Sequence, residues 1–438
     1  MARALSITLS RRAWLASLAA TATAHALGRT PLGGTLRLRV PLRTQSLDPH
    51  LADEPFSALF AGAIADPLYA LDASGKPYPA LADALPELAK GGTRVRLRAE
   101  LKTARGKPLV ARDAVFALKR ARALGASAVL ARFAAPVEVA NDPLSFVVAG
   151  ADPLALARAL SSPLCALVPR GFSPLVPDGT GAFQATLAVN LALFTRNPHA
   201  ARGASFLDRI EVAPAQELAE CLRAFEAGQA DVGWLGTGLY RPRPGALPFE
   251  GPSYGWLVLR TGLDVKNWGA PGVAQQLCDG IATQNLAQFG VHALPGAGDP
   301  SRFGGSDTPL LVADDTPELV EIARALEPLL GQGGPRTPAT PTARSVLAEA
   351  RRTRRFGFML DFVARASSDP VLAPLTLLAS VDPALAAHPP LSAPASLRDL
   401  TRSLPLGVLG ELALSGARLA EYEGLPAWQL GAVWKRTS

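Results

Sequence analysis

The stretch from Asp178 to Leu235 constrains the fold of this chain more than any other part of the sequence. Its pattern predicts a glycine-rich turn, a hairpin, a strand at 206–210, an amphipathic helix over 214–228, and a buried strand over 231–235. Gly228 is placed to end the helix. Strands that alternate with a helix in this way are typical of an α/β fold.

The bulk composition limits the class of protein. A length of 438 residues favours two or three domains, and 48% hydrophobic with 18% charged residues excludes a disordered chain. The formal charge of +7 falls to +4 once Arg3, Arg11 and Arg12 are removed with a leader segment. This mild basic balance gives no support for a nucleic-acid partner.

Cysteine and histidine usage predicts neither a metal site nor a cofactor. The three cysteines, Cys165, Cys221 and Cys278, are widely spaced, and there is no CxxC motif or Cys/His cluster. We interpret them as small buried hydrophobic residues. A single disulfide between two of them stays open. The histidines are isolated, and we expect them at the surface or in turns.

Residues 1–26 have the features of an export signal. A positive start precedes an apolar run from Ala13 to Ala24, and Ala24-His25-Ala26 forms an A-x-A cleavage site. The segment Ser10–Leu15 resembles a twin-arginine motif, although an ordinary Sec signal explains it equally well. No cysteine follows the run, so we do not expect a lipoprotein. We expect an exported, soluble protein in the periplasm, and a monomer.

The C-terminal half shows further alternation of strands and helices. The pattern predicts a strand at 309–313, a helix at 316–330 and a helix at 343–353. An alternating strand is expected at 356–364, and Ser367–Pro370 is expected to open another helix.

Several motifs occur in an order that a known family shares. They are Ser-Leu-Asp-Pro-His at Ser46–His50, the segment Asp72–Ala82, the segment Gly106–Phe116, the strand Ser253–Thr261 and the closing residues 404–435. Together they resemble the extracellular solute-binding protein family 5 of ABC transporters, whose members bind peptides, nickel or opines. The resemblance covers most of the chain after the leader.

This resemblance implies an α/β, two-lobed periplasmic binding protein of type II-like architecture with an extra N-proximal subdomain. The expected parts are lobe I at 33–52, 163–258 and 403–438, the subdomain at 53–162, and lobe II at 259–402. Such a protein captures a small solute, peptide-like or otherwise polar, between its lobes. It delivers the solute to an ABC permease and its ATPase in the inner membrane, and it is not an enzyme.

One helix departs from the family pattern. Where the family has a helix with basic and acidic residues, the segment 273–282 keeps the apolar spacing but loses those charges. This loss motivates an alternative function, in which the chain no longer serves transport and acts as a sensor or structural partner.

The resemblance also indicates that the ligand is not a generic peptide. Peptide-binding members hold the peptide ammonium with an aspartate in a W-x-A-D-Y segment, and here those positions are Val363, Ala366 and Ser367. An ammonium enclosed without a counter-charge would lose several kcal/mol. Arg365 beside this position favours an anionic or neutral polar ligand, unless it is only a solvated arginine at a strand end.

Other candidate ligand contacts lie where the chain crosses between the lobes. Asp53 and Glu54 fall on the first crossover, and strict alternation places Tyr254 and Trp256 on one face of the returning strand. Trp256 could stack over a ligand, or both aromatics could pack between the lobes. The predicted ligand-binding residues are therefore Asp53, Glu54, Tyr254, Trp256, Arg365 and Ser367.

Two short motifs point to other chemistry, with little support. Gly251–Gly255 fits the G-x-S-x-G nucleophile elbow of hydrolases, which needs a strand before the serine and a helix after it. Here a proline-rich stretch precedes Ser253 and a strand follows it. Gly179-Thr180-Gly181 lacks the third glycine of a dinucleotide-binding loop. A hydrolase stays only a third hypothesis.

Overall fold

The computed structural model describes residues 32–44, 46–234, 241, 243–264, 272–281, 283–292, 294, 309–330, 337–382, 385 and 397–436. The predicted export signal at 1–26 lies outside these residues, as does Leu235. Among the helices in the described ranges, none is long and apolar enough to cross a membrane.

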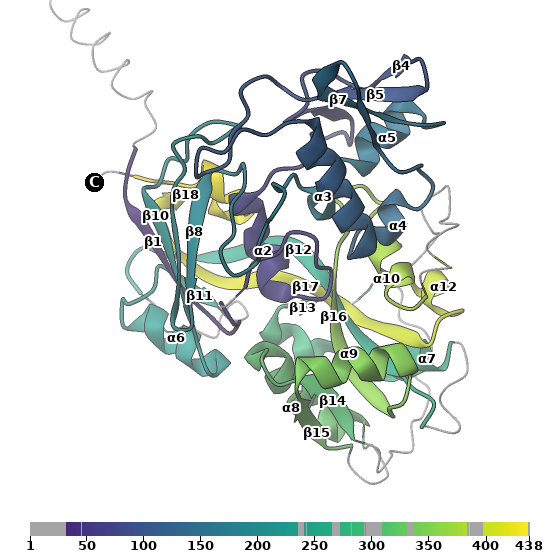
Figure 1. The fold of residues 1–438 in the computed structure, drawn as a ribbon. Coiled ribbons are helices and arrows are strands. Elements are labelled where there is room, and N and C mark those ends of the chain that lie inside the picture. The colour runs from purple at the N-terminus through teal and green to yellow at the C-terminus, as the bar shows by residue number, and fades with distance from the viewer. Residues whose placement is uncertain are drawn as a thin grey trace, which may run out of the picture.

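A sheet of 11 strands runs through both halves of the molecule, in the order β15-β14-β16-β12-β17-β11-β1-β10-β9-β8, with β13 paired to β17. Its centre is the antiparallel pair of long strands β12 (Ala246–Thr261) and β17 (Leu406–Leu419). These two strands continue from lobe I into lobe II, so the lobes share one sheet (Figure 1).

Lobe I contains the strands and the helix predicted for 178–234. They are β8 (Phe183–Ala188), β9 (Leu191–Arg196), β10 (Arg209–Pro214), α6 (Leu218–Glu226) and β11 (Val232–Trp234). The first strand, β1 (Thr35–Val40), lies parallel to β10 and β11. The predicted order is therefore confirmed, although the strand expected at 206–210 runs over 209–214 and the helix is shorter than expected. Gly228, at φ +78°, directly follows its last turn.

The glycine-rich turn before β8 packs against the end of helix α2 (Pro55–Ile64). A Cβ on Gly179 would lie 2.2 Å from the Ile64 oxygen, and a Cβ on Gly181 would lie 2.5 Å from the Ala63 oxygen. The Gly181 amide also donates to Ile64 O at 2.9 Å. The two glycines therefore allow a close backbone approach, which explains the motif without a phosphate ligand.

Lobe II is built from β14 (Leu310–Ala313), α8 (Pro317–Leu330), β15 (Ala339–Thr342), α9 (Arg344–Thr353) and β16 (Phe358–Ala364). The predicted strands and helices at 309–330 and 343–353 are confirmed. Strand β16 differs from a half-exposed strand, because all seven of its residues are buried. Met359 packs with the α9 residues Leu347 and Ala350, whereas Phe358 and Phe362 belong to the main core. Both faces of β16 are thus covered.

The remaining elements of lobe II and the C-terminal segment complete the architecture. They are α7 (Val273–Gly280), η2 (Thr283–Phe289), β13 (Val291–His292), α10 (Leu375–Ala379), α12 (Leu397–Thr401), β18 (Tyr422–Glu423), η3 (Leu425–Ala427), η4 (Leu430–Ala432) and β19 (Trp434–Lys435).

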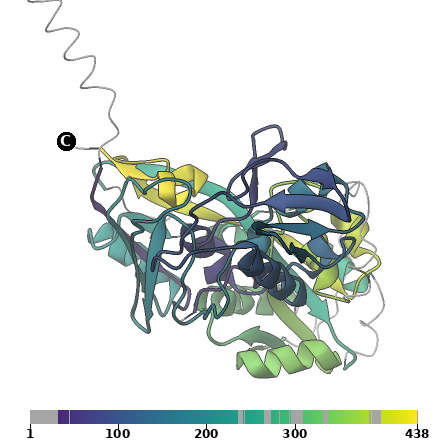
Figure 2. The same ribbon diagram turned by 45° about the horizontal axis from the view of Figure 1, so that its top comes forward.

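The N-proximal part of the chain forms its own small sheet, with the order β4-β5-β7-β6. The elements of this N-proximal part of the chain are β2 (Tyr69–Leu71), β3 (Pro77–Pro79), β4 (Glu87–Ala89), β5 (Gly92–Arg96), α3 (Ala111–Ala123), α4 (Ser127–Leu130), β6 (Val137–Val139), β7 (Asp142–Val148), α5 (Pro153–Ala159) and η1 (Pro163–Cys165). Figure 2 shows this subdomain in blue, above the green helices of lobe II.

Helix α2 lies at the junction of these parts. It packs against β8, β12 and β16. Phe60 of α2 stacks on Phe194 of β9, with ring centroids 5.7 Å apart. The division of the chain at residues 52/53, 162/163, 258/259 and 402/403 stays a prediction.

The structure corrects one local expectation, the start of a helix, and answers one open question, whether the cysteines form a disulfide. The helix expected to open at Ser367–Pro370 begins only at Leu375, because Asp369 Oδ1 accepts the Val371 and Leu372 amides and closes a turn instead. The cysteines are all free and buried.

Candidate ligand-binding site

The first crossover between the lobes, residues 46–55, is held in place by the Ser-Leu-Asp-Pro-His motif. The buried carboxylate of Asp48 accepts both ends of the Arg120 guanidinium, at 2.8 and 2.5 Å. His50 Nε2 lies 2.9 Å from the Ala166 oxygen. Burial lowers the pKa of His50. His50 is therefore a buried turn residue, not a surface one. Through Asp48 and His50, the motif connects the crossover to α3 and to the residues that follow η1.

Three cavities open along this crossover, and each takes part of its wall from it. The acidic cavity, of about 270 Å³, includes Ser46 and Glu54 in its wall. The α2 cavity, of about 440 Å³, includes Pro49 and Leu51. The arginine cavity, of about 270 Å³, includes Leu51 and Asp53. The acidic cavity lies between lobe I and lobe II, and the other two cavities also take wall residues from the N-proximal subdomain.

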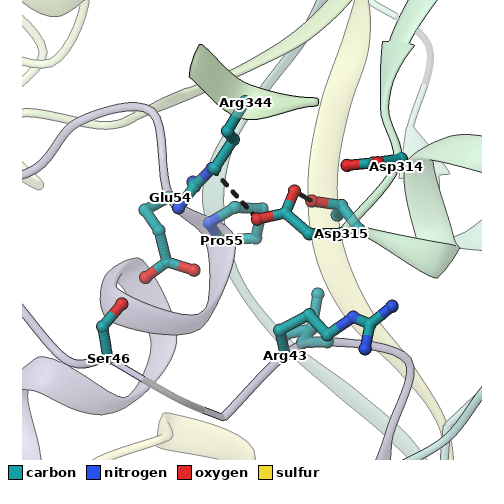
Figure 3. Close-up of a pocket in the computed structure, with 9 residues that line it drawn as sticks. Arg43, Ser46, Glu54, Pro55, Asp314, Asp315 and Arg344 are labelled. Carbon is teal, nitrogen blue, oxygen red and sulfur yellow. Dashed lines mark hydrogen bonds and ion pairs between the residues drawn. The ribbon is translucent and has the colours of Figure 1, made fainter. Parts of the chain in front are cut away.

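The acidic cavity sits where strand ends and helix starts converge. Its wall includes Arg43 beyond the end of β1, Asp314 and Asp315 beyond the end of β14, and Arg344 at the start of α9. Helices α2 and α8 also begin here. Crevices outside the carboxyl ends of strands are the usual binding position in α/β sheets. Figure 3 shows Arg344 paired with Asp315, with Glu54 on the other side of the Arg344 side chain from Asp315 in this view.

The charged groups of the acidic cavity are largely engaged. Glu54 caps α2 by accepting the Phe56 and Ser57 amides, at 3.3 and 2.6 Å. Burial raises the pKa of Glu54 in spite of the nearby Arg344. Arg344 Nε lies 3.4 Å from Asp315 Oδ2. Glu54 therefore acts first as a helix cap, and its predicted contact with a ligand stays a prediction.

The α2 cavity is the more apolar of the three and holds three of the predicted residues, Tyr254, Arg365 and Ser367. It also contains an ion pair, in which the buried Asp66 lies 3.6 Å from the exposed Arg202. Burial raises the pKa of Asp66, and the arginine opposes that shift. A neighbouring cavity of about 620 Å³ shares this pair.

Arg365 and Ser367 are both occupied by the protein itself. Arg365 Nη1 lies 3.3 Å from Glu411 Oε2, and its guanidinium lies 5.7 Å from the centre of the Trp256 ring. Ser367 Oγ accepts the Asp369 amide at 3.1 Å. Since Glu411 compensates its charge, Arg365 does not supply an unpaired cation for an anionic ligand.

The expectation that Tyr254 and Trp256 share one face of β12 is wrong. Strand β12 carries an extra residue at Tyr254, where its register against β17 shifts. A bulge of this kind reverses the alternation. The Tyr254 ring lies 5.5 Å from Phe362, which pairs with Leu257 on the face opposite to Trp256. Trp256 is 2% exposed, so stacking on a ligand would require it to be uncovered.

The face of β12 that carries Tyr254 contacts helix α8 through Glu318. On this face, Tyr254 donates to Glu318 Oε2 at 3.3 Å, and Trp234 of lobe I donates to Glu318 Oε1 at 3.4 Å. The Glu318 amide also donates to the Pro41 oxygen at 3.3 Å. Helix α8 is thus tied to lobe I. Burial raises the pKa of Glu318 to about 7, although both donors lower it.

Asp53 lies on the wall of the arginine cavity and is paired across the lobes. Its Oδ2 accepts Arg351 Nη1 at 2.8 Å, and Arg344 donates to its backbone oxygen at 3.2 Å. Burial would raise the pKa of Asp53, but Arg351 outweighs it and the pKa is lowered. Asp53 is therefore a carboxylate at neutral pH.

The six predicted residues are thus brought to one region but not to one cavity. The structure adds Arg260, Arg344, Arg351 and Glu318, which the sequence did not single out. Apart from the pairs Arg351–Asp361 and Arg344–Asp315, their side-chain partners are 64 to 298 positions away in the chain, so no local pattern could have identified those contacts. Ser253 lies inside β12, and its hydroxyl donates to the Gly255 oxygen at 3.4 Å, which is not the strand-to-helix turn of a nucleophile elbow.

The architecture defines a class of fold: two α/β lobes that share a central sheet, a small subdomain on the first lobe, and cavities at the crossover between them. No protein-family model matches the sequence, and no curated protein does. Solved structures do match, and at these low sequence identities the match shows the fold alone. One is the oligopeptide-binding protein AppA from Bacillus subtilis in complex with a nonapeptide, with a TM-score of 0.69 at 12% identity. It covers 93% of this chain and 100% of that chain.

Two further structures agree with this match. The periplasmic binding protein DppA from Helicobacter pylori, in complex with the peptide STSA, has a TM-score of 0.69 at 14% identity and covers 93% of this chain and 99% of that chain. NikA from Brucella suis, in complex with Fe(III)-EDTA, has a TM-score of 0.64 at 16% identity and covers 92% of this chain and 100% of that chain. The predicted two-lobed periplasmic binding protein fold is confirmed.

Proposed function

We propose that this chain is an exported solute-binding protein that encloses a small polar solute at the first crossover and delivers it to an ABC permease. The observation that carries this proposal is the convergence of three cavities on residues 46–55, at the junction of two lobes that share β12 and β17. A ligand held between lobes favours the closed arrangement by the contacts that it gains there. The likeness to solved solute-binding proteins supports the same function.

The backbone around β16 argues against an extended peptide as the ligand. The Ala364 amide donates to Ala52 O at 2.6 Å, and the Ala364 oxygen accepts Thr376 Oγ1 at 2.6 Å. The Ala366 amide donates to Ala373 O at 3.2 Å, and its oxygen accepts Ser162 Oγ. A peptide that adds to a strand needs such groups free. Here the protein itself occupies them, and Ala366 offers no carboxylate for an ammonium.

Thermal-shift screening tests the ligand class. Di- to pentapeptides of mixed sequence should leave the melting temperature unchanged, whereas a set of small polar metabolites should contain at least one compound that raises it. Tight binding of several unrelated peptides would contradict the proposal that the ligand is not a generic peptide.

A second candidate function is a binding-protein-like partner that has lost transport. It is favoured by α7, whose eight residues contain no basic side chain and whose Gln275 is turned inward to accept the Val408 amide at 2.9 Å. The contacts of Glu318 that tie α8 to lobe I point the same way. Small-angle scattering separates the two functions, since a contraction on adding a bound solute would argue against a fixed pair of lobes.

A further inference from the structure

The arginine cavity is lined by residues of the crossover, the subdomain and lobe II. Leu51 and Asp53 come from the crossover, Leu124 and Ser127 from the α3–α4 region of the subdomain, and Arg260 with several neighbours from lobe II. The subdomain lies close against the crossover here. A Cβ on Gly125 would be 2.7 Å from the His50 oxygen, and the Gly125 amide donates to that oxygen at 2.8 Å. Movement of the lobes would therefore change this cavity directly.

Four charged side chains form an alternating chain at this cavity. Asp53, Arg260 and Arg351 line it, and Asp361 is buried between the two arginines. Arg260 Nε donates to Asp361 Oδ2 at 2.8 Å, and Arg351 Nε lies 3.3 Å from the same oxygen. Arg351 in turn donates to Asp53 Oδ2 at 2.8 Å. The two arginines and the two aspartates balance, so the wall carries no net charge.

The two ends of this chain keep unused hydrogen-bonding capacity. Arg260 is 5% exposed, and its Nη1 donates to the Ser380 oxygen at 3.0 Å. Among the described residues, none forms a hydrogen bond with Arg260 Nη2. This nitrogen is not fully buried, and Arg260 lines the cavity. At the other end Arg351 takes only Oδ2 of Asp53, whose side chain is 43% exposed.

A neutral wall with one free donor end and one free acceptor end selects a particular kind of ligand. A purely anionic or cationic solute would bring one charge into an already balanced, partly buried site without a counter-charge. A dipolar solute brings both charges and leaves the balance intact. We propose that the arginine cavity binds a free α-amino acid, with its carboxylate on Arg260 Nη2 and its ammonium on Asp53 Oδ1.

The rest of the wall suits an aliphatic side chain on that amino acid. Leu51, Leu124, Val363 and Ala379 supply apolar surface in the same cavity. The volume of about 270 Å³ fits one small solute. This inference rests on the proposed function, since it assigns the ligand class of the same crossover region.

Calorimetric titration of the full chain with leucine, leucinamide and N-acetylleucine tests the dipolar requirement. We expect leucine to bind and each blocked analogue to bind at least about 10-fold more weakly, because each leaves one buried charge without its partner. The titration should be extended to the twenty common amino acids. Equal or tighter binding of a blocked analogue, or no binding by any of the amino acids, would overturn the inference.

The variant Asp53→Asn tests the position of the ammonium. Asp53 is half-exposed, so the variant should fold, as its melting curve will show, and it should bind leucine at least about 10-fold more weakly. Binding of N-acetylleucine should not weaken further. Asp83→Asn is the matched control, because Asp83 also pairs with an arginine, at 3.9 Å, but lies outside the cavity. Unchanged leucine affinity in Asp53→Asn would overturn the inference.

These results separate the inference from the proposed function. If native mass spectrometry finds a bound solute that carries no ammonium and no carboxylate, the inference fails while the solute-binding function stands. If no solute binds at all, both fail.

Discussion

The carboxyl group of Glu318 is buried where helix α8 meets lobe I and strand β12. Its pKa is raised from 4.5 to about 7 by burial, against the opposing effect of Trp234 and Tyr254. The native state therefore binds more protons than the unfolded state between these two values. The stabilising contribution is complete below about pH 4.5 and is lost as the pH rises through about 7.

We predict that this loss is visible in the free energy of unfolding. Between pH 4.5 and 7 the wild-type value should fall by up to about 3 kcal/mol from this group alone. Glu318→Gln keeps the shape of the side chain and cannot ionise, so urea unfolding of this variant should lack that component. Glu321→Gln, one turn further along α8 and paired with Arg324, is the control and should keep the wild-type slope. An unchanged pH slope in Glu318→Gln would refute the assignment.

Glycine substitutions should report the close approach of the turn at Gly181 to α2. In Gly181→Ala the new Cβ would meet the Ala63 oxygen at 2.5 Å, so we expect a loss of about 2 kcal/mol in unfolding free energy. Gly62→Ala is the matched change, on helix α2 that this turn approaches. Its Cβ meets nothing within 4 Å, and helix propensity should stabilise it by about 0.5–1 kcal/mol. Chemical denaturation compares the two, and equal effects would contradict the packing interpretation.

For single residues, the sequence predicted their place in the fold better than it predicted the groups that they contact. Asp53 and Glu54 were expected at the first crossover because of the motif before them, and they lie on cavity walls there. That Arg351 pairs with Asp53 depends on how β16 and α9 dock, which no local pattern encodes. Trp256 was expected to be able to meet a ligand, but it is buried beneath Arg365.

Among the elements, the first crossover is fixed by the Asp48 carboxylate, which is 3% exposed and receives Arg120 from α3. Asp48→Asn keeps the size of the side chain but removes its charge, and it leaves the half-buried Arg120 guanidinium without this counter-charge. We expect a loss of about 2 kcal/mol in unfolding free energy and faster proteolytic cleavage within residues 46–55.

Glu87→Gln serves as the control for Asp48→Asn, because Glu87 also pairs with an arginine but is 63% exposed. Its effect on unfolding free energy should stay within about 1 kcal/mol. If the two variants lose the same stability, the crossover is not anchored by Asp48. Urea denaturation followed by fluorescence gives both values.

Periodicity in the sequence predicted most elements because apolar faces set them locally. The strands and helix of 178–234 and the β-α units of lobe II were found in this way. The bulge at Tyr254 was missed, since it depends on the register of β12 against β17. The late start of α10 was missed because Asp369 closes a turn that competes with a helix cap.

For the whole molecule, one sheet shared by both lobes explains how a change at the crossover can reach both halves. The lobes are joined by β12 and β17 and by the contacts of Glu318 and Asp53. The resemblance to solute-binding proteins predicted this architecture from motif order alone. The residues predicted to contact a ligand lie where the chain departs from the family pattern, so motif order does not predict the ligand.

The most direct test is native mass spectrometry of the full chain after incubation with a mixture of small polar metabolites. We predict a one-to-one adduct of the folded protein with a single small solute, released when the protein is unfolded. The bare polypeptide mass across the whole mixture would contradict a solute-binding function.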